Sequence, residues 1–263
     1  MTTAADRWRQ SLEDWALPDH ILASAEESPW IHPPVLFQVP DVIEPSPSHD
    51  RARECVPAGG TVLDVGCGGG VAAFALTPPA VRVIGVDHQA EMLSMFRANA
   101  ERFGVSALTI EGLWPTVAHE TPRADVVTAH HVVYNVGDIV PFLSSLSEHA
   151  LQRVVIEMPD HHPLSSMSDA WQQFWQLERP VGPTPVDLLD VLNEMGVSAH
   201  RAQWRGPMHV AADPEQTANF LRIRLCLPAT RLGDVKAFLA DRPATPARDL
   251  STIWWDTADI TDR

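Results

Sequence analysis

The residues best suited to chemistry begin with a glycine-rich turn, Gly66-Cys67-Gly68-Gly69-Gly70, which follows an apolar segment at residues 61–65. Glycines let a backbone turn sharply and come close to a ligand. A helix of small residues is expected to start at Val71, and the free N–H groups of a helix N-terminus favour an anionic group. The pattern therefore predicts a nucleotide-type cofactor site at the carboxyl end of a strand.

Two acidic residues narrow the choice of ligand. Asp64 stands two residues before the first glycine, where a carboxylate repels the pyrophosphate of NAD or FAD and suits a cation. The third glycine of a dinucleotide fingerprint falls at Val71, which is neither Gly nor Ala. Asp87 ends a second apolar strand about 20 residues later, where an acid can accept both hydroxyls of a ribose. The ligand implied has a ribose, an ammonium and no pyrophosphate, which fits S-adenosyl-L-methionine (SAM).

The two segments VLDVGCGGG (62–70) and GVDHQAEML (85–93) resemble the first two motifs of class I SAM-dependent methyltransferases. The resemblance implies that Asp87 binds the ribose and that Asp64 orients the methionine ammonium, directly or through water. It is firm over about residues 55–160 and thinner at both ends. The cofactor-binding residues that it implies are Asp64, Gly66, Cys67, Gly68, Asp87, His88, Met92, Gly112, Leu113, Trp114 and His130.

The third strand ends in Gly112-Leu113-Trp114, where many methyltransferases of this class have Gly-Asp and the acid bonds the adenine amino group. Leu113 cannot make that bond, so backbone groups or Glu111 would have to supply it. The sequence favours two possible roles for Trp114 about equally. It walls the adenine, or it packs as a core tryptophan at the end of a strand.

The exit of the fourth strand carries His130, His131, Tyr134 and Asn135, and it resembles the motif that passes beneath the transferable methyl group. Displacement at a sulfonium mainly requires alignment and exclusion of water, and a base is needed only when the nucleophile keeps its proton. Histidine titrates near neutral pH and suits that role. The predicted catalytic residues are His130, His131 and Tyr134. His130 ranks first as base because it lies at the strand end, and His161 and His162 are further candidates.

Aromatic residues outside the cofactor half indicate a substrate region. Trp171 and Trp175 are four residues apart and share one face of a predicted helix, a spacing that is more often packing than binding. Because proline-rich breaks flank them, they predict a lid over an apolar or aromatic substrate. The predicted substrate residues are Trp30, His161, His162, Trp171 and Trp175. No metal site is expected, since adjacent histidines of an extended chain point to opposite faces.

Strand and helix patterns alternate over residues 61–158, which is typical of an α/β doubly wound, mostly parallel sheet with helices on both faces. The resemblance implies a seven-stranded, Rossmann-like sheet whose last strand, near 250–256, runs antiparallel between the fifth and sixth strands. The predicted organisation is a helical and extended N-terminal cap at 1–50. A SAM-binding methyltransferase domain follows at 51–263, with a lid-like insertion at about 159–185.

The composition bears on partners and location. The formal net charge is −15 and Lys236 is the single lysine, so the surface should repel a phosphate backbone and nucleic acid is not an expected partner. No apolar run reaches the ~20 residues of a membrane span, and no signal-peptide pattern begins the chain. Three scattered cysteines fit a reducing compartment. We expect a cytoplasmic monomer or homodimer.

The leading prediction is a methyltransferase acting on O, N or C of an apolar or aromatic small molecule. One alternative is a SAM-binding sensor or pseudoenzyme without catalysis, since fold alone does not establish function. An RNA or protein methyltransferase is less favoured by the acidic charge. A dinucleotide-dependent oxidoreductase is least favoured, because of Asp64 and Val71.

Overall fold

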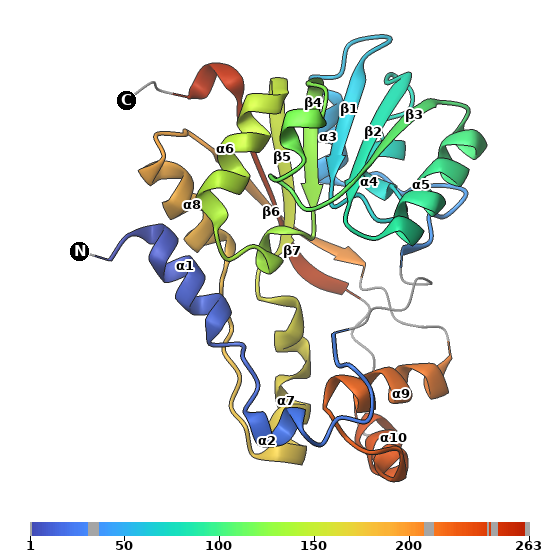
Figure 1. The fold of residues 1–263 in the computed structure, drawn as a ribbon, viewed down its shortest axis with the longest axis vertical. Helices are drawn as coiled ribbons and strands as arrows, with labels where there is room; N and C mark the ends of the chain where they lie inside the picture. Colours follow the sequence, from blue (N-terminus) through green and yellow to red (C-terminus); the bar gives the residue numbers. More distant parts are fainter. Residues whose placement is uncertain (1, 31–36, 208–212, 241, 243–246, 261–263) are drawn as a thin grey trace.

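The computed structural model describes residues 2–30, 37–207, 213–240, 242 and 247–260. Its centre is a seven-stranded sheet of order β3-β2-β1-β4-β5-β7-β6, shown in Figure 1. The strands are β1 (Thr61–Val65), β2 (Arg82–Asp87), β3 (Ser106–Glu111), β4 (Ala124–His130), β5 (Ala150–Pro159), β6 (His200–Pro207) and β7 (Ala247–Asp256).

Six of the seven strands run the same way, and β7 is the exception. β1 to β5 pair in parallel, whereas β7 is antiparallel to both β5 and β6. This confirms the predicted doubly wound, mostly parallel sheet and the antiparallel last strand between the fifth and sixth. Ligands of such sheets bind beyond the carboxyl ends of the strands, where the order reverses between β1 and β4.

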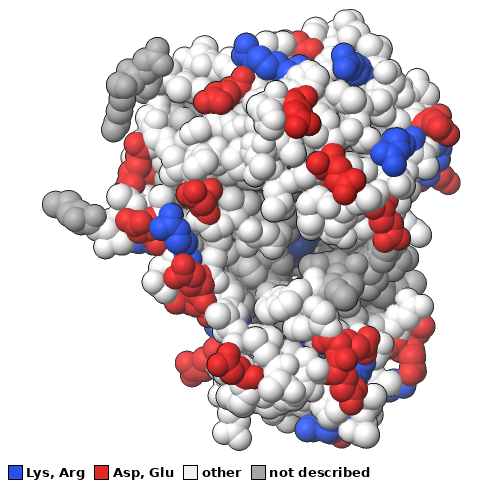
Figure 2. Space-filling model, viewed as in Figure 1, with Lys and Arg blue, Asp and Glu red and all other residues white. Residues whose placement is uncertain are grey.

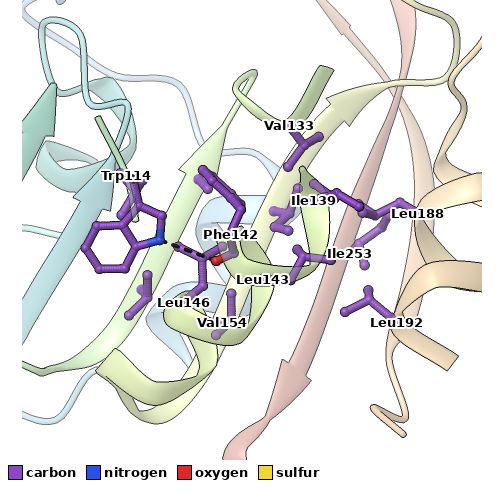
Figure 3. Close-up of a cluster of buried hydrophobic side chains, with 14 of the residues drawn as sticks. Trp114, Val133, Ile139, Phe142, Leu143, Leu146, Val154, Leu188, Leu192 and Ile253 are labelled. Atoms are coloured by element: carbon purple, nitrogen blue, oxygen red, sulfur yellow. Dashed lines mark hydrogen bonds between the residues drawn. The ribbon is translucent and has the colours of Figure 1, made fainter. Parts of the chain in front are cut away.

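Helices cover both faces of the sheet, and we call this unit the sheet domain (Figure 1). One face carries α1 (Ala4–Glu13), α6 (Ile139–His149) and α8 (Pro185–Glu194), and the other carries α3 (Pro47–Arg53), α4 (Val71–Phe74) and α5 (Ala90–Phe103). Figure 3 shows the first face, where Phe142 and Leu143 of α6 lie among Leu188 and Leu192 of α8 and residues of the strands.

Local sequence explains where these helices start and stop. In α5 the apolar residues Met92, Leu93 and Phe96 form a buried stripe, and Gly104 ends the helix with a φ of +67°. Thr184 caps α8, and Pro185 occupies the first position of that helix.

The remaining helices form a separate helical lobe, which lies beyond the end of the sheet where β4 and β5 terminate (Figure 1). The helical lobe contains α2 (Asp19–Leu22), α7 (Ser168–Trp175), α9 (Pro214–Arg224) and α10 (Leu232–Ala240). Its own apolar core includes Ile21, Trp171, Leu221, Leu225 and Val235. Three distant stretches of sequence therefore build it.

This arrangement differs from the predicted organisation in two respects. Residues 1–50 do not form one cap, because α1 packs on α8, α2 belongs to the helical lobe and α3 packs against the sheet. The predicted insertion at 159–185 supplies only part of the lobe, since α9 and α10 are inserted between β6 and β7. Within the described ranges, no helix has the length and apolar character that crossing a bilayer requires.

Candidate functional site

The glycine turn between β1 and α4 is shaped as a close cradle. Gly66, Gly68 and Gly70 have φ values of +70°, +50° and +98°, a region that side chains disfavour. A Cβ on Gly66 would lie 2.5 Å from a methyl group of Val132, and one on Gly70 would lie 2.3 Å from the ring of Phe74. The turn therefore tolerates only glycine at these positions.

Asp87 is tied directly to this turn from the end of β2. Its Oδ2 accepts a hydrogen bond from the backbone N–H of Gly68 at 3.0 Å, and its Oδ1 accepts one from Gln89 at 3.0 Å. Each oxygen keeps a further lone pair. A carboxylate held this way, beside a turn free of side chains, fits the two hydroxyls of a ribose.

Asp64 lies deeper, at the end of β1. Its carboxylate accepts hydrogen bonds from the Thr128 hydroxyl at 3.0 Å and from the Ala73 N–H at 3.3 Å. Burial raises the pKa of Asp64 to about 7, although both hydrogen bonds oppose that rise. No Lys or Arg of the described chain forms an ion pair with it. A buried acid beside a ligand cradle fits an incoming ammonium group.

The other predicted cofactor residues divide by exposure. The Cys67 side chain is buried against the turn, so the backbone of Cys67 is the part near the cradle, and its N–H donates to Val86. Met92 lies on the buried face of α5 and packs as a core residue. His88 is exposed beside Asp87, with Nδ1 3.5 Å from Oδ1.

At the end of β3 the structure distinguishes the two readings of Trp114. Its indole N–H donates to the carbonyl of Phe142 at 3.3 Å, and its ring packs edge-on against His149 in the core of the sheet domain (Figure 3). The core reading is the one that holds, because both the ring and the N–H are used in packing. Gly112 has a φ of +154°, and Leu113 is 64% exposed at the same strand end.

A histidine–carboxylate pair stands where β4 and β5 end. Nε2 of His131 lies 2.9 Å from Oε1 of Glu157. So short an approach to a carboxylate places a proton on Nε2, and in the neutral ring the lone pair then lies on Nδ1. Nδ1 is buried and has no hydrogen-bond partner among the described residues. The pair therefore presents an unused basic nitrogen, held by a backbone with a φ of +60° at His131.

Glu157 is a site residue that the sequence analysis missed. Burial alone would raise the pKa of Glu157, but hydrogen bonds from His131 and Ser48 hold it below its ordinary value. It is therefore ionised at neutral pH. An acid at the end of the apolar run Val154-Val155-Ile156 was the available signal.

His130, ranked first as base from the sequence, is less suited to that role than His131. Its ring is buried and stacks on the ring of His49 at 5.8 Å, and its Nδ1 lies 4.0 Å from Glu157. Burial lowers the pKa of His130 to about 3, so it stays neutral. Burial also raises the pKa of Tyr134 above its ordinary value, so its phenol stays protonated.

The predicted substrate residues are placed in three different ways. His162 is buried, stacks on Trp15 at 4.2 Å and accepts at Nδ1 from the Leu164 N–H, which makes it a structural residue. Trp171 packs in the helical-lobe core, and Trp175 donates to the Leu225 carbonyl at 2.7 Å.

His161 and Trp30 are exposed, and Trp30 is 51% accessible. The two tryptophans of α7 are therefore part of the core that gives the helical lobe its shape. They do not form a free lid.

Figure 2 shows a hollow between the sheet domain and the helical lobe, with acidic side chains on the surface around it.

Asp160, next to the two histidines, is already satisfied by protein groups. It accepts from Ser251 at 2.6 Å and from Arg201 at 3.2 Å, and also from Gln203. Across the described part of the chain, no group of three or more potential metal ligands comes together.

Comparison with known proteins agrees with this geometry. Residues 62–151 match the family model described as a methyltransferase domain. Ribosomal protein L11 methyltransferases from Citrobacter koseri and Escherichia coli are each 38% identical over 89 residues, which is 34% of this chain and 30% of theirs. The match therefore spans less than a third of the length of these relatives.

Two solved structures share the fold. The YcgJ protein of Bacillus subtilis has a TM-score of 0.54 at 16% identity, over 80% of this chain and 97% of its own. The BH2331 protein of Bacillus halodurans has a TM-score of 0.50 at 16% identity, over 80% of this chain and 95% of its own. With the family match, the glycine turn and the two acids, residues 62–151 are a class I SAM-dependent methyltransferase domain, and its cofactor is S-adenosyl-L-methionine.

Proposed function

We propose that this chain methylates O, N or C of an apolar or aromatic small molecule, with His131 as the general base. The observation that carries the proposal is the His131–Glu157 pair, whose free Nδ1 stands at the exit of β4. In the class I fold this exit adjoins the methyl group of the cofactor. A poised base there is expected of an enzyme whose acceptor must lose a proton.

The proposed division of labour follows from the contacts. Asp87 holds the ribose and Asp64 holds the ammonium, which fixes the sulfonium relative to the end of β4. The cofactor supplies an activated methyl group. His131 takes the acceptor proton at Nδ1, and Glu157 stabilises the resulting imidazolium by accepting the Nε2–H bond. The helical lobe excludes water from the same space.

A small-molecule acceptor is supported by charge and by architecture. The net charge of −15 disfavours a polyanionic substrate, and the hollow beside the helical lobe is bordered by acidic groups (Figure 2). The similarity to the L11 methyltransferases falls within the part of the chain that binds the cofactor, so it bears little on the acceptor.

A SAM-binding sensor is the second candidate, and one observation favours it. Leu113 stands exposed where related methyltransferases present an acid to the adenine. Loss of that bond weakens cofactor binding without removing it. An ionised Glu157 next to an unused histidine nitrogen has no evident purpose in a sensor, which is why catalysis is the leading proposal.

Methyl transfer tests the proposal directly. The full chain would be incubated with methyl-labelled SAM and three acceptor pools: phenols and amines of low molecular mass, ribosomal RNA, and ribosomal protein. We expect label in the small-molecule pool alone. His131→Ala should lower turnover by ~10²-fold or more with SAM affinity unchanged, and His130→Ala should lower it less.

The outcomes separate the candidates. Label in RNA or protein would contradict the small-molecule acceptor. Equal turnover by the wild type and His131→Ala would remove His131 as the base. Tight SAM binding with no transfer to any pool would favour the sensor.

A further inference from the structure

Two arginines of the helical lobe, the buried Arg224 and the half-buried Arg179, have no acidic partner among the described residues. Arg224 on α9 is 4% exposed and donates to the backbone carbonyl of Pro29. Arg179, which follows α7, donates to the carbonyls of Trp15 and Ala16. The Nε of each arginine is buried without a hydrogen-bond partner among the described residues. Both guanidinium groups therefore keep donors to spare.

Arg222 shows what a paired arginine looks like in the same place. It lies two positions earlier on α9 and is also 4% exposed, yet it bonds Glu27 at 2.6 Å and lies 3.6 Å from Glu26. Buried charges in proteins are normally compensated in this manner. Burial on α9 does not by itself prevent an ion pair, so the missing acidic partner of Arg224 is a property of its own surroundings.

The lack of a partner is not explained by a shortage of acids. The chain has 34 Asp and Glu against 19 Lys and Arg. Among the described residues none forms an ion pair with Arg179 or Arg224, and only the side chains of Asp241, Asp259 and Asp262 are not described. Burial lowers the pKa of both arginines, and no nearby charge acts in the other direction.

The two arginines line one small pocket with apolar walls. Its other lining includes Leu164, Met167 and Trp171, with Trp30 at one side. The Arg179 guanidinium lies over the Trp171 ring at 5.5 Å, which fixes its plane. Planar guanidinium groups bind carboxylates through paired hydrogen bonds, and apolar walls strengthen such bonds by excluding water.

Contacts connect this pocket to the end of β4. Arg179 lies 4.9 Å over the ring of Trp15, and Trp15 stacks on His162 at 4.2 Å. His162 meets Tyr134 edge-on at 5.7 Å, and Tyr134 follows His131 by three residues. Basic side-chain atoms are visible at the bottom of the hollow in Figure 2. Packed rings therefore link the pocket to the end of β4.

We propose that the pocket formed by Arg179 and Arg224 binds the carboxylate of the methyl acceptor, which makes the acceptor an apolar or aromatic carboxylic acid. This inference rests on the proposed function, because it names the acceptor class of the same site. The pocket takes the carboxylate end, and the apolar body extends toward His131.

Matched acids and amides test it by binding, without turnover. The full chain, saturated with S-adenosylhomocysteine, would be titrated with 3-phenylpropionate and 3-phenylpropionamide, then with longer aromatic and aliphatic acid–amide pairs. Calorimetry and tryptophan fluorescence would report binding. We expect at least one acid to bind roughly tenfold or more tightly than its amide, as charge-assisted hydrogen bonds predict. Equal binding within every pair, or no binding by any acid, would overturn the inference.

Three variants assign the preference to the pocket. Arg224→Met and Arg179→Met should each reduce acid binding by roughly tenfold while amide and S-adenosylhomocysteine binding stay unchanged. Arg222→Met is the matched control, which should lower the melting temperature and keep the preference for acids. If Arg224→Met does not fold, Arg224→Lys replaces it in the test. Lysine keeps the charge but cannot form the paired hydrogen bonds of a guanidinium group, so acid binding should still weaken. Full acid binding by folded Arg224 and Arg179 variants would overturn the inference.

The outcome is separable from that of the proposed function. Binding of acids that are never methylated would count against the methyltransferase proposal and leave the carboxylate pocket supported. Methylation of small molecules with no preference for acids over amides would overturn the pocket and leave the methyltransferase proposal standing.

Discussion

At the scale of single residues, the two acids of the cofactor site differ in their environment. Asp87 binds backbone N–H groups at the edge of the cradle, whereas Asp64 is buried and its pKa is raised to about 7. An acid near its titration point responds strongly to a ligand that carries a positive charge. We therefore expect Asp64 to couple SAM binding to pH.

The coupling has a definite sign. Below about pH 7 Asp64 is largely protonated in the free protein, and a bound ammonium favours its carboxylate. SAM binding should then release a proton, and affinity should fall as pH decreases, by up to about tenfold per unit well below the pKa. Calorimetry in buffers of different ionisation enthalpy measures the proton release directly. Asp64→Asn should bind weakly and independently of pH. Wild-type affinity constant from about pH 5 to 8 would contradict the role of Asp64.

The raised pKa of Asp64 also makes the stability of the folded protein depend on pH. The folded-state pKa of Asp64 lies above the unfolded value of about 3.9, so the folded protein holds an extra proton between these values. Burial of the ionised Asp64 carboxylate lowers the stability of the folded protein. This cost grows as pH rises through this window and is complete above about pH 7. Denaturant melts at several pH values should show Asp64→Asn gaining stability relative to wild type toward alkaline pH.

The cofactor residues were the most predictable part of the site. The spacing of Asp64, the glycine turn and Asp87 is local information, and the structure brings the three together at the carboxyl ends of β1 and β2. The His131–Glu157 pair was not predictable in that way. It depends on the pairing of β4 with β5, which sets residue 130 opposite Glu157, and on the left-handed backbone of His131 that turns its ring toward the carboxylate.

At the scale of elements, the glycine turn is the part most sensitive to change. Gly66→Ala would place a Cβ against Val132 at a φ of +70°, so the turn would have to move. We expect a loss of about 1–3 kcal/mol of stability together with a large loss of SAM affinity. Denaturant unfolding and SAM titration measure the two effects.

Gly104 offers a matched control for this change. It has a similar φ of +67° at the end of α5, but a Cβ there would meet nothing within 4 Å. Gly104→Ala should cost about 1 kcal/mol and leave SAM affinity unchanged. Equal SAM affinities of the two alanine variants would contradict the cradle role of the turn.

Element bounds were predictable where a local signal exists. β1 has the predicted ends, because the glycine turn marks where it stops, and a glycine likewise marks the end of α5. β5 spans Ala150–Pro159, and its length follows from pairing along both edges, with β4 and with β7. Long-range pairing of that kind leaves no signature in the local alternation of residues.

At the scale of the whole molecule, the helical lobe is the feature that the sequence did not predict as a unit. Its assembly depends on long-range contacts, such as those of Trp175 with His20 of α2 and with the Leu225 carbonyl that follows α9. The interpretation of Trp171 and Trp175 as a lid followed from their flanking prolines. Buried contacts on several sides make them structural instead.

Two tryptophan variants test whether the helical lobe serves the acceptor. Trp171→Ala removes a buried ring and should lower the free energy of unfolding by about 3–5 kcal/mol. If the helical lobe contacts the acceptor and not the cofactor, this variant should lose turnover and keep its SAM affinity. Trp30→Ala, at an exposed position, should change stability by less than about 1 kcal/mol. Thermal unfolding followed by SAM titration distinguishes these effects. Loss of SAM binding in a folded Trp171→Ala protein would show that the lobe also supports the cofactor.

The central claim is that SAM binds between Asp64, the glycine turn and Asp87. Isothermal titration of the wild type and Asp87→Ala with SAM, S-adenosylhomocysteine and NAD tests it most directly. The account predicts micromolar binding of both sulfur ligands by the wild type, no binding of NAD, and binding at least about tenfold weaker in Asp87→Ala through loss of the ribose bonds. Binding of NAD, or unchanged SAM affinity in Asp87→Ala, would contradict it.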